Sequence, residues 1–373
     1  MIRSVKIRLF PTEEQEIIMR KSVGVSRFAY NWGLARWKEL YEKGEKVSKV
    51  IVRTEFNAMK KQDEYKWLYE VSGKVTTQAF DDLDVAFKNF FKGISRYPQF
   101  KSKKKAKQSF YVRYDYIKFL DGKVNMEKIG KVKYKSNYDI PNLPKYVNPR
   151  CSFDGKCWYL SFGYEQEQPV NELTDEVIGI DVGIKNLAIC SNGMVFKNIN
   201  KTKTVKKTDK RLKRLQRKVS RKYEMNKQGN KFVKTNNIIK LERQIKLVYR
   251  RLTNIRTNHL HQATNKIVKA KPSKVVMETL NIQGMMKNKH LSKAIAQQGL
   301  YEFKRQMQYK CEWNGIEFVE ADKWYPSSKT CSQCGHVKTK LSLSERVYKC
   351  ECCGSVIDRD MNAAINLSKY QSA

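Results

Sequence analysis

Four cysteines near the end of the chain have the spacing of a metal site. Cys331 and Cys334 form one Cys-x-x-Cys pair, Cys350 and Cys353 form a second, and glycine follows each pair. Such turns aim two thiolates at one point, and four thiolates are a common ligand set for structural Zn²⁺. Core thiols or disulfides are the alternative, but the glycines allow tight turns. We expect one structural zinc in a knuckle over about residues 329–355, with Cys352 outside the ligand set.

Carboxylates near the knuckle and upstream of it could serve a different metal. Asp358 and Asp360 stand at the start of a predicted helix, while Asp181 and Glu278 each follow a short apolar strand. A buried carboxylate without a partner is costly, and a bound cation would relieve that cost. Structural roles are the alternative, such as Asp181 capping its own turn. Acids on two strand ends and one helix start indicate a ribonuclease-H-like sheet.

Such acids could cleave a phosphodiester bond. Two Mg²⁺ ions about 4 Å apart can help deprotonate the attacking water and neutralise the attacking and leaving oxygens. Mg²⁺ prefers hard oxygen ligands, so carboxylates rather than thiolates would hold it. We therefore expect a structural zinc on the cysteines and two catalytic Mg²⁺ ions on the acids.

The charge of the chain predicts a polyanionic partner. Lys and Arg number 75 against 37 Asp and Glu, a net charge of +38 that is spread along the chain. Basic residues are prominent in a loop after a proline turn and on a helical hairpin predicted over about residues 201–269. Solvated surface charge is the alternative for both. The candidate nucleic-acid-binding residues are Lys101, Lys103, Lys104, Lys105 and Lys107 in the loop, and Arg211, Arg214, Arg217 and Arg221 on the hairpin.

The N-terminal part is predicted to combine one strand with helices. Residues 2–10 alternate between apolar and charged or polar side chains, which indicates an amphipathic strand. Thr12 and Gln15 then form a capping box for a helix that ends at Gly44. The aromatic residues of this helix and the next are expected in the core, with base stacking as the alternative.

Short strands from residue 109 to residue 165 are separated by turns and predict a small β-barrel. The N-terminal strand could join it if the helices are an insertion, and a basic loop beside such a barrel often holds a phosphate backbone. A polar linker follows at residues 166–174. The expected domains are therefore residues 1–10 with 95–172, residues 11–94, and residues 173–373.

Several function classes are disfavoured. We find no apolar run near the roughly 20 residues that span a bilayer and no targeting segment, so we expect a cytoplasmic protein with no membrane association. Nine cysteines, mostly in the knuckle, suit a reducing compartment. His259 and His261 form the His-x-His pair of single-strand nucleases that use a catalytic tyrosine, but their helical context lacks an obvious acidic or metal-binding neighbour.

The order of these segments resembles a known family. GIDVGIKNLA, the strand ending at Glu278, YPSSKTCSQCG, CECCG and DRDMNAAINL resemble the RuvC nuclease domain of the TnpB family, transposon-encoded relatives of type V CRISPR effectors. The segments FAYNWGLARW and YPQFKSKKK also resemble that family's opening segments. The resemblance thus covers nearly the whole chain.

The resemblance implies a fold and an activity. The fold would be a multidomain α+β protein, with a β-barrel wedge domain that carries an inserted helical recognition lobe. A ribonuclease-H-like α/β domain of the RuvC type, with the four-cysteine zinc insertion, would follow. The activity would be RNA-guided cleavage of double-stranded DNA, with a guide RNA from the transposon end and one protein per guide RNA. The protein would read a short motif beside the target, and base pairing would read the sequence.

The resemblance also assigns the catalytic acids. Asp181 matches the first family acid and Glu278 the second, and the third precedes x-Asn in an Asp-x-Asn-Ala-Ala motif, which selects Asp360. Asp358 would then cap the helix or support the site from outside the metal ligands. All three acids are present, which argues against the alternative, a nuclease-inactive RNA-guided repressor. A DNA-joining transposase is a third class that the resemblance disfavours.

Overall fold

The computed structural model describes residues 1–137, 139–167, 171–342 and 344–371. The chain divides into two compact units, Met1–Gln166 and Glu167–Ala373. Residues 168–170 of the expected linker, residue 138 of the expected barrel and residue 343 of the expected knuckle lie outside the described residues. Within the described ranges, no helix combines the length and apolar composition needed to cross a bilayer.

The first unit is built on a seven-stranded antiparallel sheet in the order β2-β6-β7-β1-β5-β4-β3. The N-terminal strand β1 lies inside this sheet, paired with β7 and β5, and its alternate residues Val5, Ile7 and Leu9 are buried. The strands are β1 (Ile2–Phe10), β2 (Gln108–Tyr111), β3 (Lys118–Leu120), β4 (Lys123–Met126), β5 (Gly130–Lys135), β6 (Val147–Phe153) and β7 (Trp158–Glu165).

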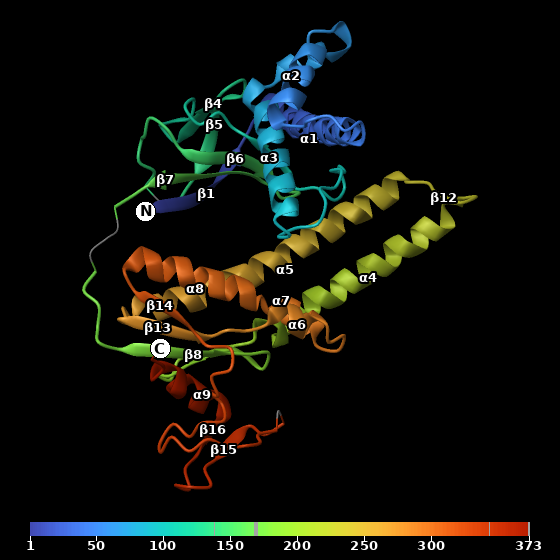
Figure 1. Ribbon diagram of the computed structural model, residues 1–373. Coiled ribbons are helices and arrows are strands. Elements are labelled where there is room, and N and C mark those ends of the chain that lie inside the picture. Colours follow the sequence, from blue (N-terminus) through green and yellow to red (C-terminus); the bar gives the residue numbers. More distant parts are fainter. Residues whose placement is uncertain (138, 168–170, 343, 372–373) are drawn as a thin grey trace. The chain divides into compact units, whose positions relative to one another are not determined.

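Helices join β1 to β2 (Figure 1), and α1 and α3 are the two that the sequence predicted. They are α1 (Glu13–Glu42), α2 (Lys49–Met59), the 3₁₀ helix η1 (Asp63–Glu70) and α3 (Gly73–Phe91). The Thr12–Gln15 capping box is present at the start of α1. Trp37 stacks on Phe87 with ring centroids 4.4 Å apart, which confirms a packing role for that pair.

The sheet of the first unit is a curled half-barrel, which agrees in part with the predicted small β-barrel. Among the described strands, β2 and β3 each have one neighbour, so the sheet has two edges. Its buried residues share one core with those of α1, α2 and α3. Because the helices cover apolar surface that a closed barrel would bury internally, the strands need not close on themselves.

The second unit is built on a five-stranded mixed sheet in the order β10-β9-β8-β13-β14. Strand β9 runs antiparallel to β8, whereas β13 is parallel to both β8 and β14. Helices α5 and α8 cover one face of the sheet and α9 lies on the other (Figure 1). The strands are β8 (Val177–Val182), β9 (Asn186–Cys190), β10 (Val195–Lys197), β13 (Lys274–Glu278) and β14 (Glu317–Ala321).

Further elements complete this unit. The short helices are η2 (Ile199–Lys201), α6 (Ile282–Met286) and α7 (Ser292–Gln298), followed by α8 (Leu300–Asn314). Two short antiparallel strands, β15 (Val347–Lys349) and β16 (Val356–Asp358), carry the second cysteine pair between them, and α9 (Arg359–Ser368) follows at once.

The predicted basic hairpin is confirmed as α4 (Lys203–Met225) and α5 (Asn236–Lys269), which pack along each other (Figure 1). Strands β11 (Lys227–Gln228) and β12 (Lys231–Phe232) form its tip, where Gly229 adopts φ +55°. Val205, Leu212, Val248 and Leu252 make the apolar seam between the two helices. The C-terminal half of α5 instead joins the core under the sheet, so the hairpin has a packed base.

Candidate active site and metal cluster

The four predicted cysteines converge in the second unit. The sulfurs of Cys331, Cys334, Cys350 and Cys353 all lie within 4.8 Å of one another. The Sγ atoms of Cys331 and Cys353 are 3.7 Å apart, and those of Cys334 and Cys350 are 3.5 Å apart. Tetrahedral Zn²⁺ with Zn–S bonds of about 2.3 Å requires sulfurs roughly 3.8 Å apart, so the cluster fits that ion. Cys352 stands outside the cluster, as predicted.

Each cysteine pair is shaped by the same local turn. The N–H of Gly335 donates to Cys331 O at 2.9 Å, and the N–H of Gly354 donates to Cys350 O at 3.2 Å. Both glycines adopt positive φ, +76° and +70°. A side chain would be strained in that conformation, which explains the glycine after each pair. The thiolates are thus set by short stretches of consecutive residues.

The carboxylate site depends on the alternation of strands β8 and β13. Ile178 and Ile180 of β8 belong to the core under α5 and α8, as do Val275 and Met277 of β13. Successive side chains of a strand point to opposite faces. Asp181 and Glu278 therefore lie on the face covered by α9. The parallel register pairs Ile180 with Met277, and one further step along it brings Asp181 beside Glu278.

A glycine allows α9 to lie directly on β8. A Cβ placed on Gly179 would be 2.0 Å from Ala364 O and 2.4 Å from Ser368 N, so the helix backbone occupies the space that any side chain would need. Gly179 and Asp181 share a strand face because they are two residues apart. The N-terminal turn of α9, which carries Asp360, is thereby held near the carboxylate of Asp181.

Asp358 and Asp360 have different roles in the structure. The Asp358 carboxylate accepts hydrogen bonds from the N–H groups of Asp360 and Met361 at 3.0 and 3.1 Å, which makes it the N-cap of α9. Asp360 lies in the first helical turn, where Arg359 Nε is 3.5 Å from its Oδ1 atom. Of the two roles predicted for Asp358, the structure shows the helix cap, and Asp360 does not serve as that cap.

The three predicted acids interact electrostatically. Burial, with the negative charges of Glu278 and Asp360, raises the pKa of Asp181 well above its usual value. Burial and Asp360 raise the pKa of Glu278 to about 7. Like charges that share a partly desolvated site favour protonation or a bound cation. Carboxylate oxygens are hard donors, and their negative charges repel one another. Both properties fit a divalent cation such as Mg²⁺.

The three acids are less tightly gathered than the four cysteines. Among the described residues, only the four cysteines form a group of three or more His, Cys, Asp or Glu ligand atoms that lie within 4.8 Å of one another. Asp181, Glu278 and Asp360 therefore do not form a compact group of that kind among the described residues.

Helix α9 also binds the first cysteine knuckle, a connection that the sequence did not predict. The fully buried Asn362 donates to Thr330 O at 2.7 Å and accepts from the N–H of Ser332 at 2.9 Å. Asn366, one turn on, donates to Ser327 O and Thr330 O, both at 2.7 Å. The sequence did contain one signal for this contact. Two asparagines four residues apart lie on the same face of a helix, where both can bond to one neighbouring segment. One helix therefore contacts both candidate metal centres.

Relatives with similar sequences identify the family. A "Putative RNA-guided DNA endonuclease" of Streptomyces pristinaespiralis is 33% identical over 369 residues, covering 98% of this chain and 88% of that protein. The "Putative RNA-guided DNA endonuclease InsQ" of Escherichia coli K12 is 30% identical over 387 residues, covering 98% and 91%. "TnpB-like protein L79" of Acanthamoeba polyphaga mimivirus is 30% identical over 136 residues, covering 35% and 25%. The chain belongs to the TnpB family.

Three family models match successive parts of this TnpB-family chain. They are the OrfB_IS605 helix-turn-helix domain over residues 1–46, the OrfB_IS605 "Probable transposase" over residues 161–289, and the Cas12f1-like TNB domain over residues 301–367. The Cas12f1-like TNB model spans both cysteine pairs and most of α9. Residues 1–46 contain β1 and one continuous helix α1 rather than two helices joined by a turn.

A solved structure has a similar fold. The protein chain in the cryo-EM structure of the Cas12f1-sgRNA-target DNA complex aligns with a TM-score of 0.59 at 15% identity, over 99% of this chain and 98% of that chain. At this level of identity the likeness concerns the fold. It supports a mixed α+β architecture for the TnpB-family chain.

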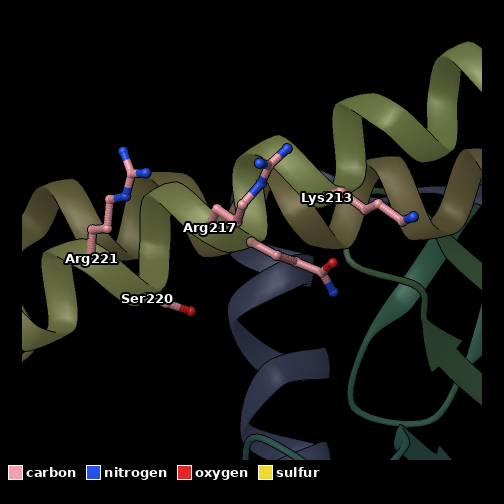
Figure 2. Close-up of a pocket in the computed structure, with 5 residues that line it drawn as sticks. Lys213, Arg217, Ser220 and Arg221 are labelled. Carbon is pink, nitrogen blue, oxygen red and sulfur yellow. The ribbon is translucent and has the colours of Figure 1, made fainter.

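The four predicted arginines of α4 line two hollows on the basic hairpin. Their spacing of three or four residues places them along one side of the helix. Figure 2 shows Lys213, Arg217 and Arg221 extending from α4 around the first hollow. Its lining is Lys213, Gln216, Arg217, Ser220 and Arg221, and that of the second is Thr204, Lys207, Thr208, Arg211, Arg214, Val248 and Arg251.

The predicted lysine loop is not uniform. Lys103, Lys104, Lys105 and Lys107 are exposed, whereas Lys101 packs with its Nζ atom 3.5 Å from the centroid of the Tyr30 ring. Burial lowers the pKa of Lys101, and its backbone exchanges two hydrogen bonds with Asn31. Lys101 therefore anchors the loop to α1, and the other four lysines are the ones free to meet an anion.

The histidine pair has structural contacts. His259 and His261 lie within α5, where His259 Nε2 contacts Lys197 O at 2.9 Å. Burial lowers the pKa of both rings. Lys310 Nζ donates to His261 O at 3.0 Å, so the backbone here is part of the helix packing. These contacts agree with the sequence-based preference for a non-catalytic role.

Proposed function

We propose that this TnpB-family chain is an RNA-guided DNA endonuclease that hydrolyses target DNA at Asp181, Glu278 and Asp360. The observation that carries the proposal is the arrangement of these acids at the ends of two adjacent parallel strands and at the start of α9, where burial and the charge of Asp360 raise the pKa of Glu278 to about 7. Curated relatives that align over nearly the whole chain carry the name of that activity.

The three acids would hold two Mg²⁺ ions. When bound, the ions would supply charge neutralisation for the attacking and leaving oxygens and lower the pKa of the attacking water. The chain itself fixes the positions of the carboxylates, through the pairing of β8 with β13 and the packing of α9 against Gly179. Arg359, beside Asp360, would moderate the negative charge of the site.

The cysteine cluster would hold one structural Zn²⁺. Four thiolates leave no open coordination position, so the ion would stabilise the fold rather than react. Its knuckle is bonded to α9 through Asn362 and Asn366. Zinc would therefore support the helix that carries Asp360.

The basic surfaces would contact a guide RNA and target double-stranded DNA. The arginine row of α4 and the exposed Lys103, Lys104, Lys105 and Lys107 offer cations that can neutralise backbone phosphates. In this proposal residues 1–10 with 95–172, which include the strands of the half-barrel, are a wedge domain, residues 11–94 are a recognition lobe, and residues 173–373 are the RuvC nuclease. One protein would bind one guide RNA transcribed from the transposon end, in the cytoplasm.

The test is cleavage by the protein purified with RNA transcribed from the transposon end. A plasmid library with a matched target and randomised flanking bases, in Mg²⁺ buffer, should yield cut molecules that share one flanking motif. Binding of matched plasmid without cleavage would favour the nuclease-inactive repressor. Strand-transfer products would favour a transposase instead.

A further inference from the structure

An exposed tryptophan follows the strand next to the carboxylates. Ala321 ends β14 and pairs with Glu278, the last residue of β13. Neighbouring strands are about 4.8 Å apart, so the chain leaves the sheet beside Glu278 and continues through Asp322 and Lys323 to Trp324. The loop therefore belongs to the same edge of the sheet as the catalytic candidates.

The indole of Trp324 is presented to solvent together with a positive charge. Trp324 is 80% exposed, against 41% for Trp67. The Nζ atom of Lys323 lies 4.7 Å from its ring centroid. A large apolar ring in water carries a free-energy cost that burial against a ligand would recover. An aromatic face with an adjacent cation suits a nucleobase and its phosphate.

The backbone beneath this ring is held in place. The N–H of Trp324 donates to Asp322 Oδ1 at 2.7 Å, and the N–H of Asp322 donates to the Tyr370 hydroxyl at 3.2 Å. The Tyr325 hydroxyl donates to Asn366 O at 3.0 Å on α9. Tyr325 and Tyr370 also pack edge to face, with centroids 4.9 Å apart. The loop is thus fixed to the helix that carries Asp360.

We propose, on the basis of the nuclease function above, that Trp324 and Lys323 form a stacking site for a nucleobase of the DNA strand being cleaved. The ring would stack on an unpaired base, and Lys323 would meet a nearby phosphate. A base held on this loop fixes the position of its backbone relative to Asp181, Glu278 and Asp360. The site accepts any base, because every base has a π face.

The direct test measures stacking separately from cleavage. The complex of the Asp181→Asn protein with guide RNA is mixed with target DNA that carries 2-aminopurine at the scissile position. We expect the probe to lose fluorescence on stacking and to regain most of it in the Asp181→Asn, Trp324→Ala protein. Equal quenching in both proteins would overturn the proposal.

The kinetic test uses the otherwise wild-type complex. Trp324→Ala should lower the cleavage rate by about 10-fold, since stacking on an aromatic side chain contributes roughly 1–3 kcal/mol per base. Guide-RNA affinity should stay unchanged, and Trp324→Phe should restore most of the rate. Tyr301→Ala removes another aromatic side chain of the same unit, 65% exposed on α8, and should cleave normally.

Other outcomes would assign the ring elsewhere. A rate loss as large in Tyr301→Ala as in Trp324→Ala would overturn the proposal, because the effect would then be general. A change in oligomeric state in Trp324→Ala, with unchanged cleavage and quenching, would place the ring in a protein interface and also overturn it. An inactive wild-type complex would contradict the nuclease function, whereas the fluorescence comparison would still test the stacking site.

Discussion

The cysteine cluster and the acidic site lie at two surfaces of the same helix, α9, and are assembled in opposite ways. The cysteines come from two short turns, each closed by its own backbone hydrogen bond and its own positive-φ glycine. The acids come from positions 181, 278 and 360, and neighbouring residues do not dictate that they meet. Strand register and helix packing bring them together.

Because of this difference, a substitution far from the two centres should disturb the acidic site more than the cysteine cluster. A thiolate cluster with attractive ligand–metal bonding holds its own geometry once its turns form. Carboxylates repel one another, so their geometry must be imposed by the sheet and by α9. The asparagine contacts from α9 to the knuckle then link the two centres.

The largest expected effect follows from removing one acid. Asp181→Asn keeps the side-chain shape and removes one charge, and it should lower the cleavage rate by at least about 100-fold, because even residues outside the metal ligands contribute 10–100-fold. Guide-RNA binding should stay near normal in a filter-binding assay. Asp358→Asn, which keeps a cap acceptor, is the control. If it abolished cleavage while Asp360→Asn did not, the third acid would be reassigned.

The next effect concerns the cysteine cluster. Cys331→Ser should release zinc, measured by elemental analysis, and destabilise the second unit by about 3 kcal/mol or more, since structural zinc supplies folding free energy. Cleavage should also fall, because the knuckle is bonded to α9. Cys352→Ser, outside the cluster, should keep zinc, stability and cleavage. A wild-type protein without zinc would contradict this prediction.

The acidic site should make stability depend on pH. The pKa of Glu278 is raised from 4.5 to about 7, so its favourable contribution is complete below pH 4.5 and is lost as pH rises through 7. In Mg²⁺-free buffer, stability should fall by up to about 3 kcal/mol between pH 5 and 8. Calorimetry should show a smaller fall with added Mg²⁺.

Glu278→Gln provides the matched comparison for that pH dependence. The neutral side chain cannot ionise, so the fall between pH 5 and 8 should shrink and the response to Mg²⁺ should weaken. An identical pH profile in both proteins would mean that other groups cause the dependence. The acids would then be less strongly coupled than their arrangement indicates.

The smallest expected effect comes from disturbing the packing of α9 against Gly179. In Gly179→Ala, the added Cβ would meet helix backbone at 2.0 Å, so α9 must move; overpacking of this kind costs about 1–3 kcal/mol. Cleavage should fall further than in Gly183→Ala, where the nearest atom is Asn186 O at 3.6 Å. Equal activity in the two variants would show that α9 can shift without displacing Asp360.

The elements predicted with success carry their signal locally. The capping box at Thr12, the basic hairpin and the exclusion of Cys352 from the cluster each depend on residues a few positions apart. The predicted small β-barrel is a curled half-barrel in the structure, because closure depends on what covers the apolar face, here α1, α2 and α3. Lys101 was grouped with its neighbours because nothing in the loop sequence points to the ring of Tyr30.

By itself, the sequence determined the four thiolates, the glycines that turn them, the positive charge of α4 and the identity of the candidate acids. Turn geometry and helix spacing are properties of consecutive residues, so these features need no knowledge of the rest of the fold. Only the tertiary structure decided that Glu278 stands beside Asp181, that α9 rests on Gly179, and that Asn362 and Asn366 bind the knuckle. Those contacts join segments far apart in the chain. They exist because the strands pair in one register and because α9 packs against Gly179, which has no side chain.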